Sequence, residues 1–264
     1  ISANDIASNG IEPIGILLAV MLPEGTTEED ITHIMGQAAE TAAECNIEII
    51  GGHTEITKAV NRPVVVSTAV GRGFKGQSAS ASEIKPGDAI LMTKTAGIEG
   101  TGIIACDYEE ELREVLSGEE LEHAKSLLSK VSVVKDGIIA GRIGTHGMHD
   151  VTEGGILGAV WEMCSIAGTG ARLDAEAIPA DDVTRRICEH YDINMLRLIS
   201  SGSMLIMTEE DKKEEIIREL AAQGIPAAQI GKIVPKEEGL SICEGGKQTQ
   251  IDPPGPDELY KIVK

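Results

Sequence analysis

The order of apolar and polar residues along the chain predicts strands and helices in alternation. The uninterrupted apolar run IGILLAVML (14–22) is typical of a strand buried on both faces. A Thr-Thr pair followed by acids forms a helix N-cap signature, and apolar residues at helical spacing then predict a helix to about Cys45. IEII (47–50) and PVVVSTAV (63–70) predict two more strands, so the chain begins as strand, helix, strand, loop and strand.

The remainder of the chain continues this pattern with longer helical stretches. We expect strands at 89–95, 171–178 and 203–208, a strand, turn and helix at 147–168, a pair of strands at 228–234 and 239–245, and helices at about 109–130, 132–143, 180–199, 209–224 and 256–263.

One stretch interrupts the pattern and divides the chain. Residues 71–88 are rich in Gly, Ser and Ala and end in a Pro-Gly turn, which is typical of a linker. We therefore predict an N-terminal α/β domain at 1–75 and a C-terminal α+β domain at 84–264. The first residues, ISANDIASNG, read as the middle or end of a helix and lack a Met, so we expect the first domain to be truncated at its start.

Composition narrows the class of partner. The formal net charge is −20, and non-specific binding to nucleic acid or to an anionic membrane needs clustered Lys and Arg instead. An acidic protein can still bind a nucleotide if Mg²⁺ and backbone N–H groups supply positive charge. Five scattered cysteines without CxxC spacing fit a reducing cytoplasm, and no apolar run reaches the roughly 18 residues of a membrane span.

Two polar motifs lie in the first quarter of the chain. Asn4 and Asp5 fall within one helical turn and could be a ligand pair or an ordinary surface pair. IIGGHTEI (49–56) brings Gly51 and Gly52 after a predicted strand, followed by His53, Thr54 and Glu55. Such glycines allow close approach to a phosphate, and His or Glu can ligate a metal; the alternative is a tight turn with a solvated His.

Two further motifs lie in the second predicted domain. Lys94 stands at a strand end beside three glycines, which could form a phosphate cradle or a plain loop, although the stretch does not match a P-loop. MHDVTEGG places Asp150 and Thr152 before Gly154 and Gly155, where a helix N-terminus could bind phosphate. The alternative there is an ordinary N-cap. Ser-Ser-Gly at 200–202 could likewise face a phosphate or merely stop a helix.

The order of these motifs resembles the PurM-like (AIR synthase-related) superfamily, which includes thiamine-monophosphate kinase, selenophosphate synthetase and the HypE-type hydrogenase-maturation dehydratase. NDIASNGIEP, IIGGHTE, ILMTK, MHDVTEGG and SSGSMLI carry the resemblance, which is closest to the HypE-like branch. It implies an N-terminal α/β domain whose sheet forms a barrel on homodimerisation, a C-terminal α+β domain, and a Mg-ATP cleft near the dimer interface.

The resemblance also implies roles for individual residues. It makes Asp5 and Asp150 Mg²⁺ ligands and Asp150 and His53 catalytic, with His53 at a position that is acidic or His in relatives. It assigns nucleotide contacts to Asn4, Gly51, Gly52, Thr54, Lys94, Thr152, Gly154 and Gly155.

The implied function is ATP-dependent phosphorylation, and thereby activation, of an unidentified small substrate by a phosphotransferase or ligase. Two alternatives remain: a HypE-like hydrogenase-maturation factor that works with a partner protein, and an inactive nucleotide-binding regulator. The HypE-type enzymes end in a cysteine that carries a carbamoyl group, whereas this chain ends LYKIVK and its last cysteine, Cys243, falls in a predicted strand. That departure argues against carbamoyl-dehydratase activity.

Overall fold

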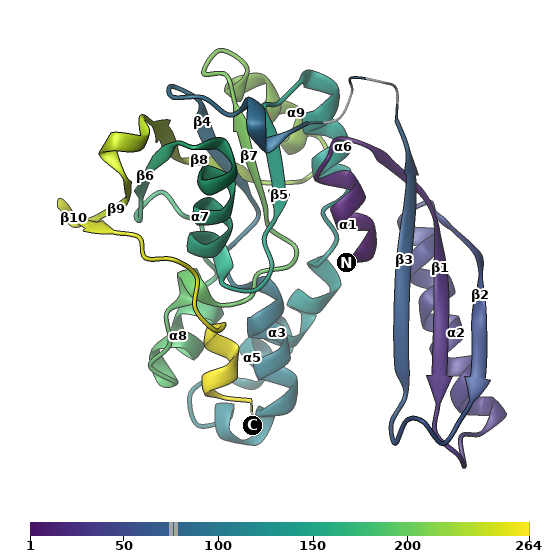
Figure 1. Cartoon of the computed structure of the whole chain (residues 1–264). Coiled ribbons are helices and arrows are strands. Elements are labelled where there is room, and N and C mark those ends of the chain that lie inside the picture. The colour runs from purple at the N-terminus through teal and green to yellow at the C-terminus, as the bar shows by residue number, and fades with distance from the viewer. Residues whose placement is uncertain (74–75, 77–78, 264) are drawn as a thin grey trace.

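Figure 1 shows the computed structural model of the chain, which describes residues 1–73, 76 and 79–263. Its secondary structure is built on two separate β-sheets, a small one from the first quarter of the chain and a large one from the remainder. This two-sheet arrangement of mixed helix and strand confirms the predicted fold class. Part of the predicted linker, residues 74–75 and 77–78, lies outside the described residues.

The small sheet has three strands in the order β2-β1-β3. The central strand β1 pairs parallel with β2 and antiparallel with β3. Helix α2 begins at a capping box formed by Thr27 and Asp30 and covers one face of the sheet, where it packs on Ile16, Leu18 and Val20. The elements of this part are α1 (Ser2–Ala7), β1 (Glu12–Leu22), α2 (Glu28–Glu44), β2 (Glu48–Ile56) and β3 (Val64–Arg72).

Strand β2 does not end at its glycines, as the sequence pattern suggested, but continues through them to Ile56. Gly51 and Gly52 have φ of 152° and 148°, beside an irregularity in the β1–β2 register between Ile16 and Leu17. A Cβ on Gly52 would lie 1.9 Å from the carbonyl oxygen of Leu18. The two glycines therefore serve the strand pairing, because only glycine tolerates this backbone and this close approach.

The other face of the small sheet carries apolar side chains that nothing covers in the described chain. Six of the nine large hydrophobic residues that are exposed among the described residues belong to β1, β2 and β3. In the register Val65 and Ile56 stand opposite Val20 and Leu22 on the α2 side, whereas Leu17 and Val66 lie on the other face. In the strand register Ala19 stands opposite Val66 on one side and His53 on the other, so all three share a face. We call the face that contains Leu17, Ala19, His53 and Val66 the open face.

The large sheet has seven strands in the order β10-β9-β6-β8-β4-β7-β5. Helix α7 packs on one side of it, and helices α6 and α9 pack on the other (Figure 1). The strands are β4 (Ala89–Thr93), β5 (Gly147–Asp150), β6 (Gly170–Asp174), β7 (Met204–Thr208), β8 (Ala227–Val234), β9 (Leu240–Glu244) and β10 (Lys247–Gln250).

Helices α3, α5 and α8 form a second apolar cluster below this sheet with the C-terminal turn. The helices of this part are α3 (Ile98–Asp107), α4 (Glu109–Leu112), α5 (Gly118–Ser126), α6 (Val134–Ile143), α7 (Gly155–Ala167), α8 (Asp182–His190) and α9 (Lys213–Ala222), with 3-10 turns η1 (Ala81–Glu83), η2 (Leu127–Lys130), η3 (Met195–Arg197), η4 (Lys236–Glu238) and η5 (Glu258–Lys261). No helix in the described ranges is long and apolar enough to cross a membrane.

Four local predictions need correction. The glycine-rich stretch after Lys94 is helical from Ile98, and its Gly100 and Gly102 lie against Leu198 and Leu128, where a Cβ would come within 2.5 Å. The predicted helix at 109–130 is broken into α4, α5 and η2. The predicted strand pair β8 and β9 is separated by β6, and β10 was missed because its Lys-Gln-Thr-Gln sequence has no apolar pattern.

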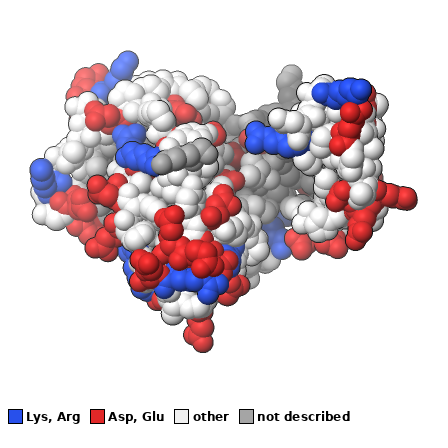
Figure 2. Space-filling model, turned by 90° about the horizontal axis from the view of Figure 1, so that it is seen from below, with Lys and Arg blue, Asp and Glu red and all other residues white. Residues whose placement is uncertain are grey.

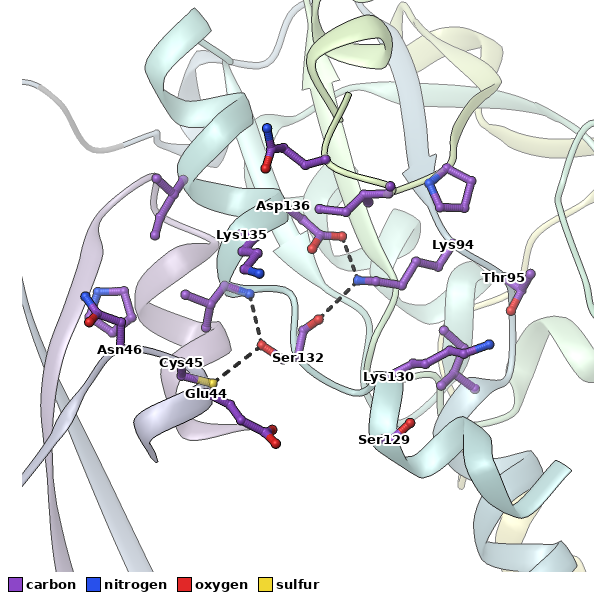
Figure 3. Close-up of a pocket in the computed structure, with 18 of the residues that line it drawn as sticks. Glu44, Cys45, Asn46, Lys94, Thr95, Ser129, Lys130, Ser132, Lys135 and Asp136 are labelled. Atoms are coloured by element: carbon purple, nitrogen blue, oxygen red, sulfur yellow. Dashed lines mark hydrogen bonds and ion pairs between the residues drawn. The ribbon is translucent and has the colours of Figure 1, made fainter. Parts of the chain in front are cut away.

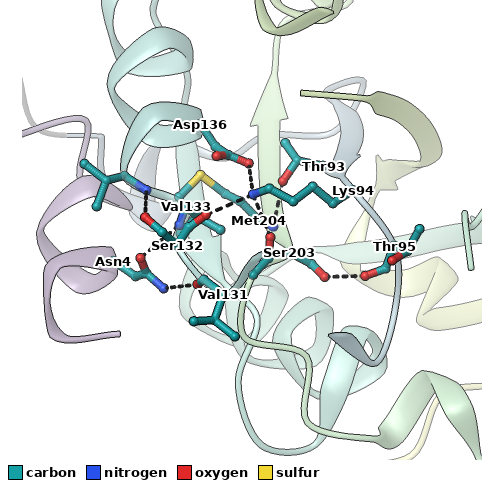
Figure 4. Close-up of polar contacts among 12 residues, drawn as sticks. Asn4, Thr93, Lys94, Thr95, Val131, Ser132, Val133, Asp136, Ser203 and Met204 are labelled. Atoms are coloured by element: carbon teal, nitrogen blue, oxygen red, sulfur yellow. Dashed lines mark hydrogen bonds and ion pairs between the residues drawn. The ribbon is translucent and has the colours of Figure 1, made fainter. Parts of the chain in front are cut away.

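Asn4 ties the short helix α1 to the large domain (Figure 4). Its side chain is 1% exposed. The amide nitrogen donates to the carbonyl of Val131 at 2.9 Å, and the amide oxygen accepts from the N–H of Val133 at 2.9 Å. These two bonds satisfy the backbone of a loop segment just before α6 and fix α1 beside it.

The glycine pair of β2 predicts unequal costs of substitution. Both Gly51→Ala and Gly52→Ala strain a backbone at positive φ, by roughly 1–3 kcal/mol, but only the second adds a clash with the Leu18 carbonyl. We expect Gly52→Ala to lower the urea midpoint clearly more than Gly51→Ala. Equal midpoints would contradict the close approach of β2 to β1.

The Asn4 clamp predicts a stability loss that a neighbouring asparagine does not share. Asn4→Ala leaves the buried N–H of Val133 without its partner, which costs about 1–3 kcal/mol. Asn9→Ala removes only an exposed bond to the Asp5 carbonyl, and should change the free energy of unfolding by at most about 0.5 kcal/mol. Chemical denaturation of the two variants measures the difference, and a loss of similar size in both would reject the clamp.

Candidate functional site

Two carboxylates from distant parts of the chain come together where α1 meets the end of β5. Asp150 is the last residue of β5 and is 3% exposed. One of its oxygens, Oδ2, is buried and has no hydrogen-bond partner among the described residues. A buried polar atom without a partner is uncommon and indicates a missing ligand, ion or water.

Asp5 is the second carboxylate of this pair. Burial raises its pKa, and repulsion from the charge of Asp150 raises it further. Two carboxylates that repel each other in this way are stabilised by a cation placed between them. The sequence-predicted metal ligands Asp5 and Asp150 are thus brought together by the fold.

His149 lies beside the pair and is held on both sides by acids. Its Nε2 is 3.0 Å from Oε2 of Glu162 on α7, and its Nδ1 is 3.8 Å from Oδ1 of Asp150. Burial alone would lower the pKa of His149, but the hydrogen bonding and charge of Asp150 and Glu162 outweigh burial and raise it above 6.5. His149 belongs to the MHDVTEGG motif, but the motif assigned it no role, because its role depends on Glu162, thirteen residues away.

The donor set fits Mg²⁺. Within the described ranges no group of three or more His, Cys, Asp or Glu side chains is arranged to hold a metal. Mg²⁺ does not need one, since it prefers hard oxygen ligands and is commonly bound by one or two carboxylates together with phosphate oxygens and water. Asp5 and Asp150 supply two such carboxylates.

The fold does not bring the residues of β2 to this pair within one chain. His53 is exposed on the open face, 3.5 Å from Glu55, and neither it nor Gly51, Gly52 or Thr54 is near β5. β2 packs on β1 and α2, and Figure 1 places it at the edge of the small sheet that faces away from the large sheet. Any role of His53 beside Asp150 would require a second copy of the chain.

The start of α7 is closed rather than open. The N–H of Gly154 donates to Oδ2 of Asp257 at 2.7 Å, and a Cβ on Gly155 would lie 2.6 Å from the Leu196 carbonyl. Thr152 is half-buried beside them, with its carbonyl accepting the N–H of Gly155. The predicted phosphate contacts of Gly154 and Gly155 are therefore replaced by contacts within the protein. The contact of Asp257 with Gly154 could not be predicted from the sequence, because the two residues are far apart along the chain.

Lys94 is also occupied by the protein. Its ammonium group donates to Oδ1 of Asp136 at 2.7 Å and to the carbonyls of Gly202 and Ser132 at 2.8 and 3.1 Å (Figure 4). Burial lowers the pKa of Lys94, and the charge of Asp136 opposes that effect. All three donors of the ammonium are in use, so Lys94 joins β4, α6 and the loop before β7 rather than offering its charge to a free phosphate.

A pocket of about 680 Å³ lies between the two parts of the chain (Figure 3). The C-terminal end of α2 forms one wall, and the end of β4, the segment before α6 and the loop after α9 form the other. Polar and charged residues that line it include Glu12, Glu44, Cys45, Asn46, Lys94, Ser129, Lys130, Ser132, Lys135 and Asp136. Figure 2 shows patches of acidic side chains, with fewer basic ones, among mostly uncharged residues, so a group of lysines at a pocket is a local exception to the acidic balance of the chain.

Comparison with known proteins places the chain in a family. The family model for AIR synthase related protein, N-terminal domain, matches residues 1–73, and that for the C-terminal domain matches residues 85–243. Carbamoyl dehydratase HypE of Escherichia coli is 27% identical over 267 residues, which cover 99% of this chain and 76% of that protein. A Methanocaldococcus jannaschii protein named for hydrogenase expression and formation is 25% identical with the same coverage.

Solved structures agree with the sequence comparison. The crystal structure of E. coli HypE superposes with a TM-score of 0.84 at 25% identity, over 99% of this chain and 80% of that one. A HypE structure in complex with ATP (TM-score 0.77, 19% identity, 99% and 79% coverage) and a HypE–HypF complex (0.80, 22%, 96% and 82%) share the fold. The chain belongs to the AIR synthase related protein family, with the PurM-like fold, and it resembles the HypE branch of that family.

Proposed function

We propose that this chain is an ATP-using, HypE-like hydrogenase-maturation protein in which Asp5 and Asp150 hold Mg²⁺ on the phosphates of the nucleotide. The observation that carries the proposal is the partnerless Oδ2 of Asp150, buried beside the repelling carboxylate of Asp5. The relatives named above support the choice of branch, and a HypE of the same fold is known in complex with ATP.

The choice of the HypE branch reverses one expectation from the sequence. From the sequence we placed ATP-dependent phosphorylation of an unidentified small substrate ahead of the HypE-like maturation role. The relatives named above instead favour hydrogenase maturation, and the chain spans 76% of the length of the E. coli HypE that it matches. We therefore place the maturation role ahead of the kinase role.

The chain's own groups would act mainly by position and charge. Mg²⁺ would neutralise the β- and γ-phosphate oxygens, which is the main electrostatic need of phosphoryl transfer. Asp150 is fixed by the antiparallel pairing of β5 with β7 and by its burial, so its carboxylate keeps one direction. The Glu162–His149 pair would hold a positive group next to Asp150 and limit its movement. The acceptor would carry an oxygen that phosphorylation turns into a leaving group.

A second copy of the chain would complete the assembly. The open face of the small sheet exposes the aliphatic side chains of Leu17 and Val66, and apolar surface that is left uncovered can mark an interface. A twofold pairing of two such faces would bury Leu17 and Val66 and would place His53 of each copy at the interface. The HypE–HypF complex of the same fold supports, in addition, a separate maturation-partner protein.

The Mg²⁺ site can be tested through the pKa of His149. In metal-free protein this pKa is raised by Asp150 and Glu162, so the histidine stabilises the fold fully below pH 6.5 and loses that contribution as pH rises through its raised pKa. Mg²⁺ bound with ATP would neutralise the carboxylate of Asp150. Because that carboxylate then stabilises protonated His149 less, the pKa of His149 would fall. NMR titration of the imidazole protons measures it, with His149→Asn to assign the signal.

The control for this experiment is His33, on the exposed surface of α2, whose imidazole proton signals should not respond to Mg-ATP. Asp150→Asn should lower the pKa of His149 without metal and abolish its response to Mg-ATP. An unaltered titration of His149 at saturating Mg-ATP would refute the metal site at Asp150.

The dimer predicts a specific effect of charge on the open face. Val66→Glu places a carboxylate where Val66 is now 51% exposed and should convert a dimer to a monomer at micromolar concentration. Ile166→Glu changes an aliphatic residue on α7 that is still more exposed, at 66%, and should leave the dimer intact. Size-exclusion chromatography with light scattering measures both; a wild-type monomer, or a dimer insensitive to Val66→Glu, would contradict the interface.

A further inference from the structure

The pocket between α2 and the segment before α6 is a separate place from the carboxylate pair. Neither Asp5, His149 nor Asp150 lines it. Asn4 holds the segment 131–133 from the side of α1, whereas the hydroxyl and carbonyl of Ser132 face Cys45 and Lys94 on the pocket side (Figures 3 and 4). The segment before α6 thus separates two places where ligands could act.

One wall of the pocket offers positive charge that the protein does not use. Lys130 and Lys135 line the pocket and are exposed, and no ion pair or hydrogen bond of either ammonium group is found in the described part of the chain. By contrast, Lys94, which also lines the pocket, forms an ion pair with Asp136. Ser129 and Ser132 place hydroxyl groups on the same wall. Two free ammonium groups beside two hydroxyls suit a phosphate group.

The opposite wall offers acceptors. Glu12 at the start of β1 and Glu44 at the end of α2 are exposed to the pocket and have no ion pair in the described ranges. Asn46 follows them with its side-chain amide. Carboxylates on this wall would repel a second phosphate and would accept hydrogen bonds from hydroxyl or amino groups.

The space between these walls is of the right size and partly apolar. A volume of about 680 Å³ falls in the range of small-molecule sites, which are roughly 300–1,000 Å³. Ile138 and Pro226 give it an apolar surface on which a flat ring could lie.

We propose that this pocket binds a nucleoside monophosphate, with its phosphate at Lys130 and Lys135 and its hydroxyl and amino donors at Glu12 and Glu44. The molecule would bridge the end of α2 to the start of α6. Because α6 and its leading segment also hold Asn4 of α1, which carries Asp5, occupancy of this pocket would be felt at the carboxylate pair. The site would therefore report nucleotide status to the Mg²⁺ site.

Cys45 gives a direct readout of occupancy. It lines the pocket, is half-buried, and its sulfur lies 3.8 Å from Oγ of Ser132. Cys106 is exposed on α3 and does not line the pocket, so it serves as an internal control. The rate of alkylation of each cysteine by iodoacetamide, followed by peptide mass spectrometry, is measured in EDTA with AMP, adenosine or inorganic phosphate as the probe.

We expect AMP to slow alkylation of Cys45 by about tenfold at ten times its Kd, by mass action, and to leave Cys106 unchanged. The Lys130→Ala/Lys135→Ala variant should lose this protection, whereas Lys236→Ala, an exposed lysine on η4, should keep it. Asp150→Asn should also keep it, which separates this pocket from the proposed Mg²⁺ site.

Four results would overturn the proposal. The first is alkylation of Cys45 in the wild type that AMP leaves unchanged, and the second is protection that survives in the double lysine variant. Protection that disappears in Asp150→Asn would place AMP at the carboxylate pair instead. Equal protection by inorganic phosphate alone would remove the nucleoside from the assignment and also counts against it.

Discussion

The arrangement of the sites depends on the two hydrogen bonds between the Asn4 side chain and the loop before α6. The side chain is buried, it satisfies both a carbonyl and an N–H of that loop, and it fixes the short helix α1 against the large domain. Six residues is too short for a helix to be stable alone, so α1 relies on this tertiary contact. Its position decides that Asp5 stands near Asp150, and its partner loop decides where the interdomain pocket begins.

The two parts of the molecule contribute different things to the proposed activity. The large sheet fixes Asp150 and His149 on β5, and Glu162 on α7 holds the histidine from the other side. Within one chain, the small sheet contributes no described polar group to the Asp5–Asp150 pair. It presents the open face, on which His53 lies beside Ala19. Positioning of the metal is thus a property of one copy, while completion of the cleft would be a property of two.

Much of the fold could be predicted from the sequence, since aliphatic runs such as 14–22 and helical spacing before Cys45 are local signals. The parts that failed depend on contacts across the chain. Gly51 and Gly52 resembled a turn because the carbonyl of Leu18, which explains Gly52, is more than thirty residues away. Asp150 was a candidate metal ligand from its own motif, whereas Asp5 was assigned to Mg²⁺ only through the resemblance of the motif order. Asn4, Lys94 and Gly154 were expected to contact a nucleotide. Instead, their polar groups form hydrogen bonds with Val131, Asp136 and Asp257, respectively. No local sequence pattern indicates these partners.

The most direct measurement is a crystal structure of the protein with Mg²⁺ and a non-hydrolysable ATP analogue, compared with the metal-free form. We predict a metal ion bound by Oδ2 of Asp150 and a carboxylate oxygen of Asp5, with the remaining ligands from phosphate and water. A metal bound elsewhere, or a triphosphate that leaves Oδ2 of Asp150 without a ligand, would contradict it.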